Sequence, residues 1–179
     1  MSAAESEFGR LDFLVNNAGW STRIPHRHFE DLTDEIWDRT LDTNLRGMFY
    51  CVRAAVPLLE KRDGAAIVNI ASVAALTGQG SSMVYAASKA GMVTMTKSLA
   101  RALAPKIRVN AVLPGFVRTR FAGWPQKAFE DAEKITPLRR LATVEDIADA
   151  VLFFAVHAMG TTGETLVVDG GMSTLGPTL

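Results

Sequence analysis

The sequence has little of several features that would point to particular classes of protein. Its 179 residues include one cysteine, Cys51, which cannot form an internal disulfide; this fits a reducing compartment. We expect Cys51 to be a small buried apolar side chain. No apolar run approaches the ~20 residues that span a bilayer, and the first residues lack the apolar core of a signal peptide, so we expect a cytoplasmic protein. Nineteen basic and nineteen acidic residues cancel, which gives no electrostatic case for nucleic acid or a membrane as partner.

The residues that are present predict a single α/β domain over residues 1–179. Hydrophobic residues make up 48% of the chain, enough for one core. Four apolar segments read as strands, and they are residues 11–16, 65–71, 107–113 and 165–169. Residues 2–9 look like the last turns of a helix, and three further helices are expected at 34–61, 82–103 and 143–157. Alternating strands and helices imply a doubly wound parallel sheet.

Unusual polar and small residues follow the predicted strands. Asn16 to Gly19, Ser72 and Pro114-Gly115 all stand at carboxyl ends, where ligands bind on such sheets. Residues 116–141 are irregular and aromatic, which is typical of a substrate lid. The pair His26 and His28 has no further Cys or His nearby in the sequence, so we expect no metal site.

Tyr85 and Lys89 are one helical turn apart and should share one face of a helix. An ammonium beside a phenol should lower the pKa of the phenol, and the Ser72 hydroxyl could hold a substrate oxygen against it. The three residues therefore predict a proton-transfer site. Each also has a plain interpretation: Tyr85 as a half-buried aromatic, Lys89 as a solvated amine and Ser72 as a strand cap.

Several motifs, in order along the chain, resemble those of the short-chain dehydrogenase/reductases. They are Asn16-Asn17-Ala18-Gly19, Asn44, Ser72, Tyr85-x-x-x-Lys89, Pro114-Gly115-Phe116-Val117-Arg118-Thr119 and the ending Val168-Asp169-Gly170-Gly171. The ending is similar to the branch that contains the 3-oxoacyl-(acyl-carrier-protein) reductases. The resemblance implies a Rossmann-like fold and an NAD- or NADP-dependent oxidoreductase that interconverts a carbonyl and a secondary alcohol.

The resemblance also implies roles for individual residues. Tyr85 would be the general acid/base, Lys89 would lower its pKa and bind the nicotinamide ribose, and Ser72 would polarise the substrate oxygen. Asn44, whose plain interpretation is an exposed polar residue in mid-helix, would position a water that links Lys89 to solvent. The expected cofactor-binding residues are Asn16, Ala18, Gly19, Tyr85, Lys89, Pro114, Gly115, Val117 and Thr119, the last of which has the plain interpretation of an N-cap.

The family's first three strands and its glycine-rich turn have no counterpart before Asn16. The residue that selects NAD or NADP is absent with them, and the outer edge of strand 11–16 should be bare. Two hypotheses follow: an oxidoreductase acting on a small carbonyl or alcohol, or a non-catalytic remnant that folds and oligomerises. We expect weak dinucleotide binding by the chain as given, and a homo-oligomer, dimer or tetramer, through helices 34–61 and 82–103.

Overall fold

The computed structural model describes residues 2–178 and centres on a four-stranded parallel sheet. The strands, in their order across the sheet, are β1 (Phe13–Asn16), β2 (Ala65–Ile70), β3 (Ile107–Pro114) and β4 (Thr165–Val168). All three neighbouring pairs run parallel, with Asn16 beside Asn69 and Asn69 beside Ala111. The parallel α/β sheet predicted from the alternating pattern is therefore confirmed.

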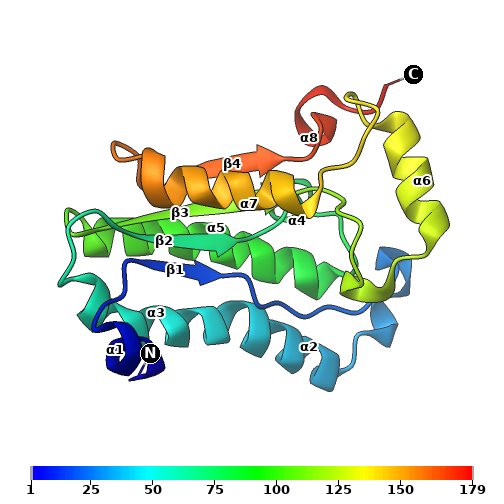
Figure 1. Ribbon diagram of the computed structural model, residues 1–179. Helices are drawn as coiled ribbons and strands as arrows, with labels where there is room; N and C mark the ends of the chain where they lie inside the picture. Colours follow the sequence, from blue (N-terminus) through cyan, green and yellow to red (C-terminus); the bar gives the residue numbers. More distant parts are fainter. Residues whose placement is uncertain (1, 179) are drawn as a thin grey trace.

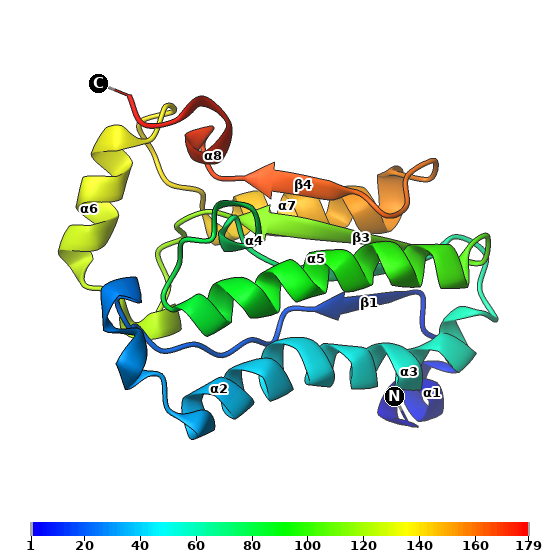
Figure 2. The same ribbon diagram turned by 180° about the vertical axis from the view of Figure 1, so that it is seen from behind.

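Helices lie on both faces of the sheet (Figures 1 and 2). The α-helices are α1 (Ser2–Phe8), α2 (Asp34–Leu41), α3 (Gly47–Leu59), α4 (Ala74–Thr77), α5 (Met83–Leu103), α6 (Gln126–Ile135), α7 (Val144–Leu152) and α8 (Met172–Leu175). The short 3-10 and π segments are η1 (His26–Asp31), η2 (Asp42–Arg46), η3 (Phe121–Gly123) and η4 (Phe153–His157). Figure 1 shows α6 and η3 beyond the arrowheads, at the carboxyl ends of the strands.

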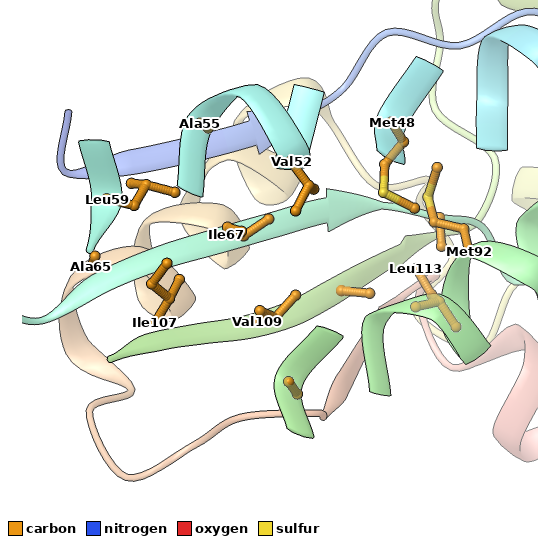
Figure 3. Packing of buried hydrophobic residues seen from close by; sticks show 13 residues of the cluster. Met48, Val52, Ala55, Leu59, Ala65, Ile67, Met92, Ile107, Val109 and Leu113 are labelled. Carbon is orange, nitrogen blue, oxygen red and sulfur yellow. The ribbon is translucent and has the colours of Figure 1, made fainter. Parts of the chain in front are cut away.

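An apolar core lies between the sheet and its helices on each face. In the larger one, Val52 and Leu59 of α3 share a cluster with Ile67 of β2 and Val109 of β3, and Met92 of α5 lies beside Met48 at one end of it (Figure 3). The second core lies on the opposite face, because neighbouring strand residues point to opposite sides. It joins Val68 of β2 and Val112 of β3 to Phe154 of η4 and Ala150 of α7.

The predicted helix over residues 34–61 forms as α2, a π-helical turn and α3 in succession. Thr33 caps it by accepting a hydrogen bond from the Ile36 amide at 3.4 Å. The π turn, η2, contains Asn44, which is fully buried, so its plain interpretation as an exposed polar residue does not hold. The prediction for Cys51 was also wrong: its thiol is exposed, because the buried side of α3 is formed by residues such as Met48 and Val52.

Strand β1 lies at one edge of the sheet, as expected for a chain that matches the family from its fourth strand. Helices α7 and η4 pack against β2, β3 and β4. Phe13 and Val15, the alternate residues of β1, keep 39% and 43% of their surface exposed. The bare, apolar edge predicted from the sequence is confirmed for the part of the chain that the structure describes.

The segment 116–141 is more regular than its sequence indicates. It contains α6, a ten-residue helix that follows Pro125 and buries Phe129. An ion pair of 2.7 Å between Arg118 and Glu133 fastens this helix to the loop after β3. Pro125 before the helix and Pro137 after it mark its ends, and Phe129, Ala132 and Ile135 recur at three-residue spacing within it. Among residues 2–178, no helix has the length and apolar character of a membrane span.

Candidate active site

The carboxyl ends of β2 and β3 are joined by backbone hydrogen bonds that fix Ser72 beside Pro114. The Ala71 amide donates to the Val112 carbonyl at 2.8 Å, and the Val73 amide donates to the Pro114 carbonyl at 3.0 Å. A Cβ at Gly115 would lie 2.6 Å from Asp169 Cβ, closer than side chains approach. The close approach of Asp169 therefore requires glycine at position 115, independently of any role in cofactor binding.

Tyr85 and Lys89 extend from the first turns of α5 toward these strand ends. Ser82 caps the helix, because its hydroxyl accepts a hydrogen bond from the Tyr85 amide at 3.3 Å. Tyr85 is 9% exposed and Lys89 is 3% exposed, so Tyr85 is more deeply buried than a half-buried aromatic and Lys89 is not a solvated amine. Lys89 Nζ lies 5.8 Å from the centre of the Tyr85 ring and donates to the Ile70 carbonyl at 2.6 Å.

Burial controls the protonation of both groups. It raises the pKa of the Tyr85 phenol above its usual value of 10.0, and the Ser72 hydroxyl offsets part of this shift. Burial lowers the pKa of Lys89 from 10.5 to about 8. The expectation of a lowered phenol pKa was wrong, because the loss of hydration on burial raises it. Tyr85 therefore holds its proton at neutral pH.

Asn44 is fully buried and ties the turn after β1 to α5. Its Oδ1 accepts from the Trp20 amide at 2.7 Å, while its Nδ2 donates to the Trp20 carbonyl at 2.9 Å and to Ser88 Oγ at 3.0 Å. Both amide hydrogens are thus used by the protein. The π turn that carries Asn44 has the geometry found at many functional sites.

Asn16 belongs to a chain of buried polar side chains that crosses the sheet. Its Nδ2 donates to Asn69 Oδ1 at 2.8 Å, and Asn69 Nδ2 donates to Thr96 Oγ1 at 2.9 Å. Asn69 and Thr96 are 0% exposed. The chain fixes the end of β1 against β2 and α5, so the side chain of Asn16 is occupied by a structural contact.

Gly19, one of the predicted cofactor-binding residues, lies close to Asn44 and Lys89. A Cβ built on it would be 3.4 Å from Asn44 Oδ1, 3.8 Å from Lys89 Nζ and 3.8 Å from Phe121 Cε2. The Phe121 ring also packs on Tyr85, with ring centroids 5.7 Å apart. Gly19, Asn44, Lys89 and Tyr85 are therefore brought together in one place, and Phe121 joins them.

The other predicted residues lie around this centre. Ala18 is exposed in the turn after β1. Val117 forms a parallel bridge with Ala142, and Thr119 Oγ1 accepts from the Phe121 amide at 3.2 Å. The N-cap interpretation of Thr119 does not hold, because Arg120 is the N-cap of η3. Neither the Val117 bridge nor the Thr119 hydrogen bond involves Tyr85.

Two strained residues lie in the segment 116–141, which the sequence predicts to be a lid. Ala122 has φ +58° and Arg139 has φ +53°, in the left-handed region that costs a residue with a Cβ about 1–2 kcal/mol. Backbone strain of this kind gathers at binding and switch segments. Within residues 2–178, His, Cys, Asp and Glu side chains form no group of three that could hold a metal ion.

Sequence reasoning missed Ser88, Asn69, Thr96 and Phe121. Ser88 shares the Tyr85–Lys89 turn of α5 and could have been found there. Asn69 and Thr96 interrupt apolar stretches, and buried polar groups of this kind need partners. Nothing in the sequence indicates that Phe121 packs on Tyr85, because the two lie on different elements and Phe121 stands in an irregular segment.

Comparison with known proteins agrees with this arrangement. The family model described as Enoyl-(Acyl carrier protein) reductase matches residues 1–173. The chain is 40% identical over 169 residues to the 3-oxoacyl-[acyl-carrier-protein] reductase FabG of Thermotoga maritima, covering 93% of this chain and 68% of that protein.

Two solved structures share both the fold and part of the sequence. The 3-ketoacyl-(acyl-carrier-protein) reductase of Brucella melitensis, complexed with NADH, has a TM-score of 0.85 and 35% identity, covering 96% of this chain and 71% of the other. ElxO with NADP bound has a TM-score of 0.84 and 32% identity, covering 95% and 70%. The chain therefore belongs to the short-chain dehydrogenase/reductase family, as an NAD(P)-dependent oxidoreductase that resembles the 3-oxoacyl-(acyl-carrier-protein) reductases.

Proposed function

We propose that this protein reduces a carbonyl to a secondary alcohol, with Tyr85 as the general acid. The observation that carries the proposal is the meeting of Ser72, Tyr85 and Lys89 at the carboxyl ends of β2 and β3. The Tyr85 phenol is buried, its pKa is raised, and the Ser72 hydroxyl acts on its oxygen. The protonated phenol can give its proton to a substrate oxygen that gains negative charge, and its raised pKa means that a neighbouring group must stabilise the phenolate that remains.

The neighbouring side chains would each support that transfer. Ser72, held beside Pro114, would donate a hydrogen bond to the substrate oxygen and keep it next to the phenol. Lys89 carries its charge below about pH 8, and a charge in this dry site would stabilise the phenolate left after the transfer. Asn44 would hold the turn that contains Gly19 in place. We also propose that a water beside Asn44 links Lys89 to solvent.

The residues present fit the nicotinamide end of the cofactor. Gly19 has no side chain and faces Lys89, whose remaining N–H groups could bind a ribose hydroxyl. Backbone groups of Gly115 and Val117, with Ala18, Pro114 and Thr119, would complete that end. The bound cofactor supplies the hydride. Because β1 is an edge strand and no glycine-rich turn precedes it within residues 2–178, we keep the prediction that this chain binds dinucleotide weakly.

A panel of carbonyl compounds tests the proposal. The chain is mixed with NADH or NADPH and with a 3-oxoacyl thioester, a simple ketone or an aldose, and loss of the reduced nicotinamide is followed optically. Consumption that depends on the carbonyl compound supports reduction. A folded chain that binds either nucleotide but consumes none with any carbonyl would instead support the non-catalytic alternative.

A further inference from the structure

The Phe121 ring occupies the space between the turn after β1 and the proton donor. Its Cε2 atom lies 3.8 Å from the position of a Cβ on Gly19, and its centroid lies 5.7 Å from that of Tyr85. The same Gly19 position is 3.8 Å from Lys89 Nζ. One aromatic ring therefore bridges the expected cofactor-binding turn and the expected catalytic residue.

This space is where the proposed reaction needs a flat ring of the same size. The nicotinamide is a planar six-membered ring, and it must approach Lys89 and Tyr85 from the side of Gly19 if these residues have the roles proposed above. A phenyl ring in that place fills the volume and covers the phenol. If the nicotinamide takes this approach, the Phe121 ring would compete with it for the same space.

The backbone before and after Phe121 shapes the turn that places its ring there. Thr119 Oγ1 accepts a hydrogen bond from the Phe121 amide at 3.2 Å. On the other side, Ala122 adopts φ +58° and Gly123 adopts φ +62°, which together turn the chain sharply after the ring. Ala122 is strained in this conformation, because its Cβ disfavours positive φ. The strain would be relieved if the segment moved away from the site.

We propose that Phe121 is a gate that competes with the nicotinamide ring and thereby sets the affinity of this protein for its cofactor. The inference rests on the proposed function. The observed conformation is the closed one, and the affinity for cofactor is reduced by the fraction of molecules that are closed. Strain at Ala122 makes the closed conformation easier to leave than it would be with glycine at that position.

Two substitutions should move the affinity in opposite directions. Phe121→Ala removes the competing ring and should tighten NADH or NADPH binding by about tenfold. Ala122→Gly relieves the strain of the closed conformation and should weaken binding by about fivefold. Phe8→Ala serves as the control, because Phe8 is 71% exposed and α1 lies at the far end of the sheet from η3 (Figure 1).

Binding is measured by fluorescence titration of NADH and of NADPH, up to millimolar concentrations. Amide hydrogen exchange of residues 117–125 is measured without nucleotide; it should be faster in Phe121→Ala and slower in Ala122→Gly. Opposite shifts in both measurements support the gate. Equal affinities in the wild type and both variants, or weaker binding by Phe121→Ala, would overturn it while leaving the proposed function intact. Failure of every folded variant to bind either nucleotide would overturn the proposed function and the gate with it.

Discussion

Lys89 donates a 2.6 Å hydrogen bond to the backbone carbonyl of Ile70, so its ammonium ties α5 to the carboxyl end of β2. The group is 3% exposed, and burial lowers its pKa from 10.5 to about 8. The folded protein thus keeps a charge in a place that disfavours it. At neutral pH this lysine lowers the free energy of unfolding.

The pH dependence of stability should reveal this penalty. Between about pH 8 and 10.5 the unfolded chain keeps the Lys89 proton and the folded chain has lost it, so stability rises with pH in this window. The lowering from 10.5 to about 8 corresponds to about 3 kcal/mol. We expect the stability of the wild type to rise by up to about this amount relative to Lys89→Met between pH 7 and 10.5, as measured by urea unfolding. Parallel curves for the two proteins would contradict the assignment.

The same lysine should shape the pH profile of reduction. Tyr85 keeps its proton to above pH 10, because burial raises its pKa, so its own ionisation limits activity only in strong alkali. Lys89 loses its charge near pH 8, and with it the stabilisation of a phenolate. We expect kcat/KM for carbonyl reduction to fall above about pH 8, since this ratio reports ionisations of the free enzyme. In Lys89→Arg, any remaining activity should lack this fall.

Asn44 should stabilise the fold in addition to its proposed role in the site. Asn44→Ala leaves the partly buried amide and carbonyl of Trp20 without their partner, and each such loss costs about 1–3 kcal/mol when the group cannot reach water. We expect the free energy of unfolding to fall by about 3 kcal/mol. Thr43→Ala, one residue earlier in the same π turn, is the control and should change it by less than about 1 kcal/mol. Similar losses in both variants would remove the special role of Asn44.

Two glycines offer a matched test of the strand-end geometry. A Cβ at Gly115 would meet Asp169 Cβ at 2.6 Å and Cα at 3.0 Å, whereas one at Gly160 meets nothing within 4 Å. Gly115→Ala should therefore destabilise the protein by about 2 kcal/mol, since β3 or β4 must shift. Gly160→Ala should be neutral or slightly stabilising. Thermal unfolding of the two variants distinguishes them, and a neutral Gly115→Ala would show that the loop has more room than the structure indicates.

The sequence predicts those features that depend on local pattern. The strand predicted at 65–71 is an apolar run interrupted only by Asn69, and Thr143 to Asp146 is a visible capping box, which the structure contains. The convergence of Ser72, Tyr85 and Lys89 follows from the parallel topology, since carboxyl ends of strands meet at one edge of the sheet.

Features that depend on tertiary contacts could not be predicted. Arg108, within an apolar strand, is 9% exposed. It donates to the carbonyls of Phe154 and Ala155 in η4 and of Ala158, which follows η4. The raised pKa of Tyr85 depends on how deeply α5 is covered, and the contact of Phe121 with Tyr85 depends on the path of an irregular lid. Short-range spacing contains none of this information.

Replacement of the phenol hydroxyl tests the central claim most directly. Tyr85→Phe keeps the buried ring and its contact with Phe121 but removes the proton donor. With a carbonyl substrate that the wild type reduces, we expect kcat to fall by about 10²- to 10⁴-fold at neutral pH, while the nucleotide Kd and the unfolding temperature stay close to those of the wild type. Undiminished reduction by Tyr85→Phe would contradict the assignment of Tyr85 as the general acid.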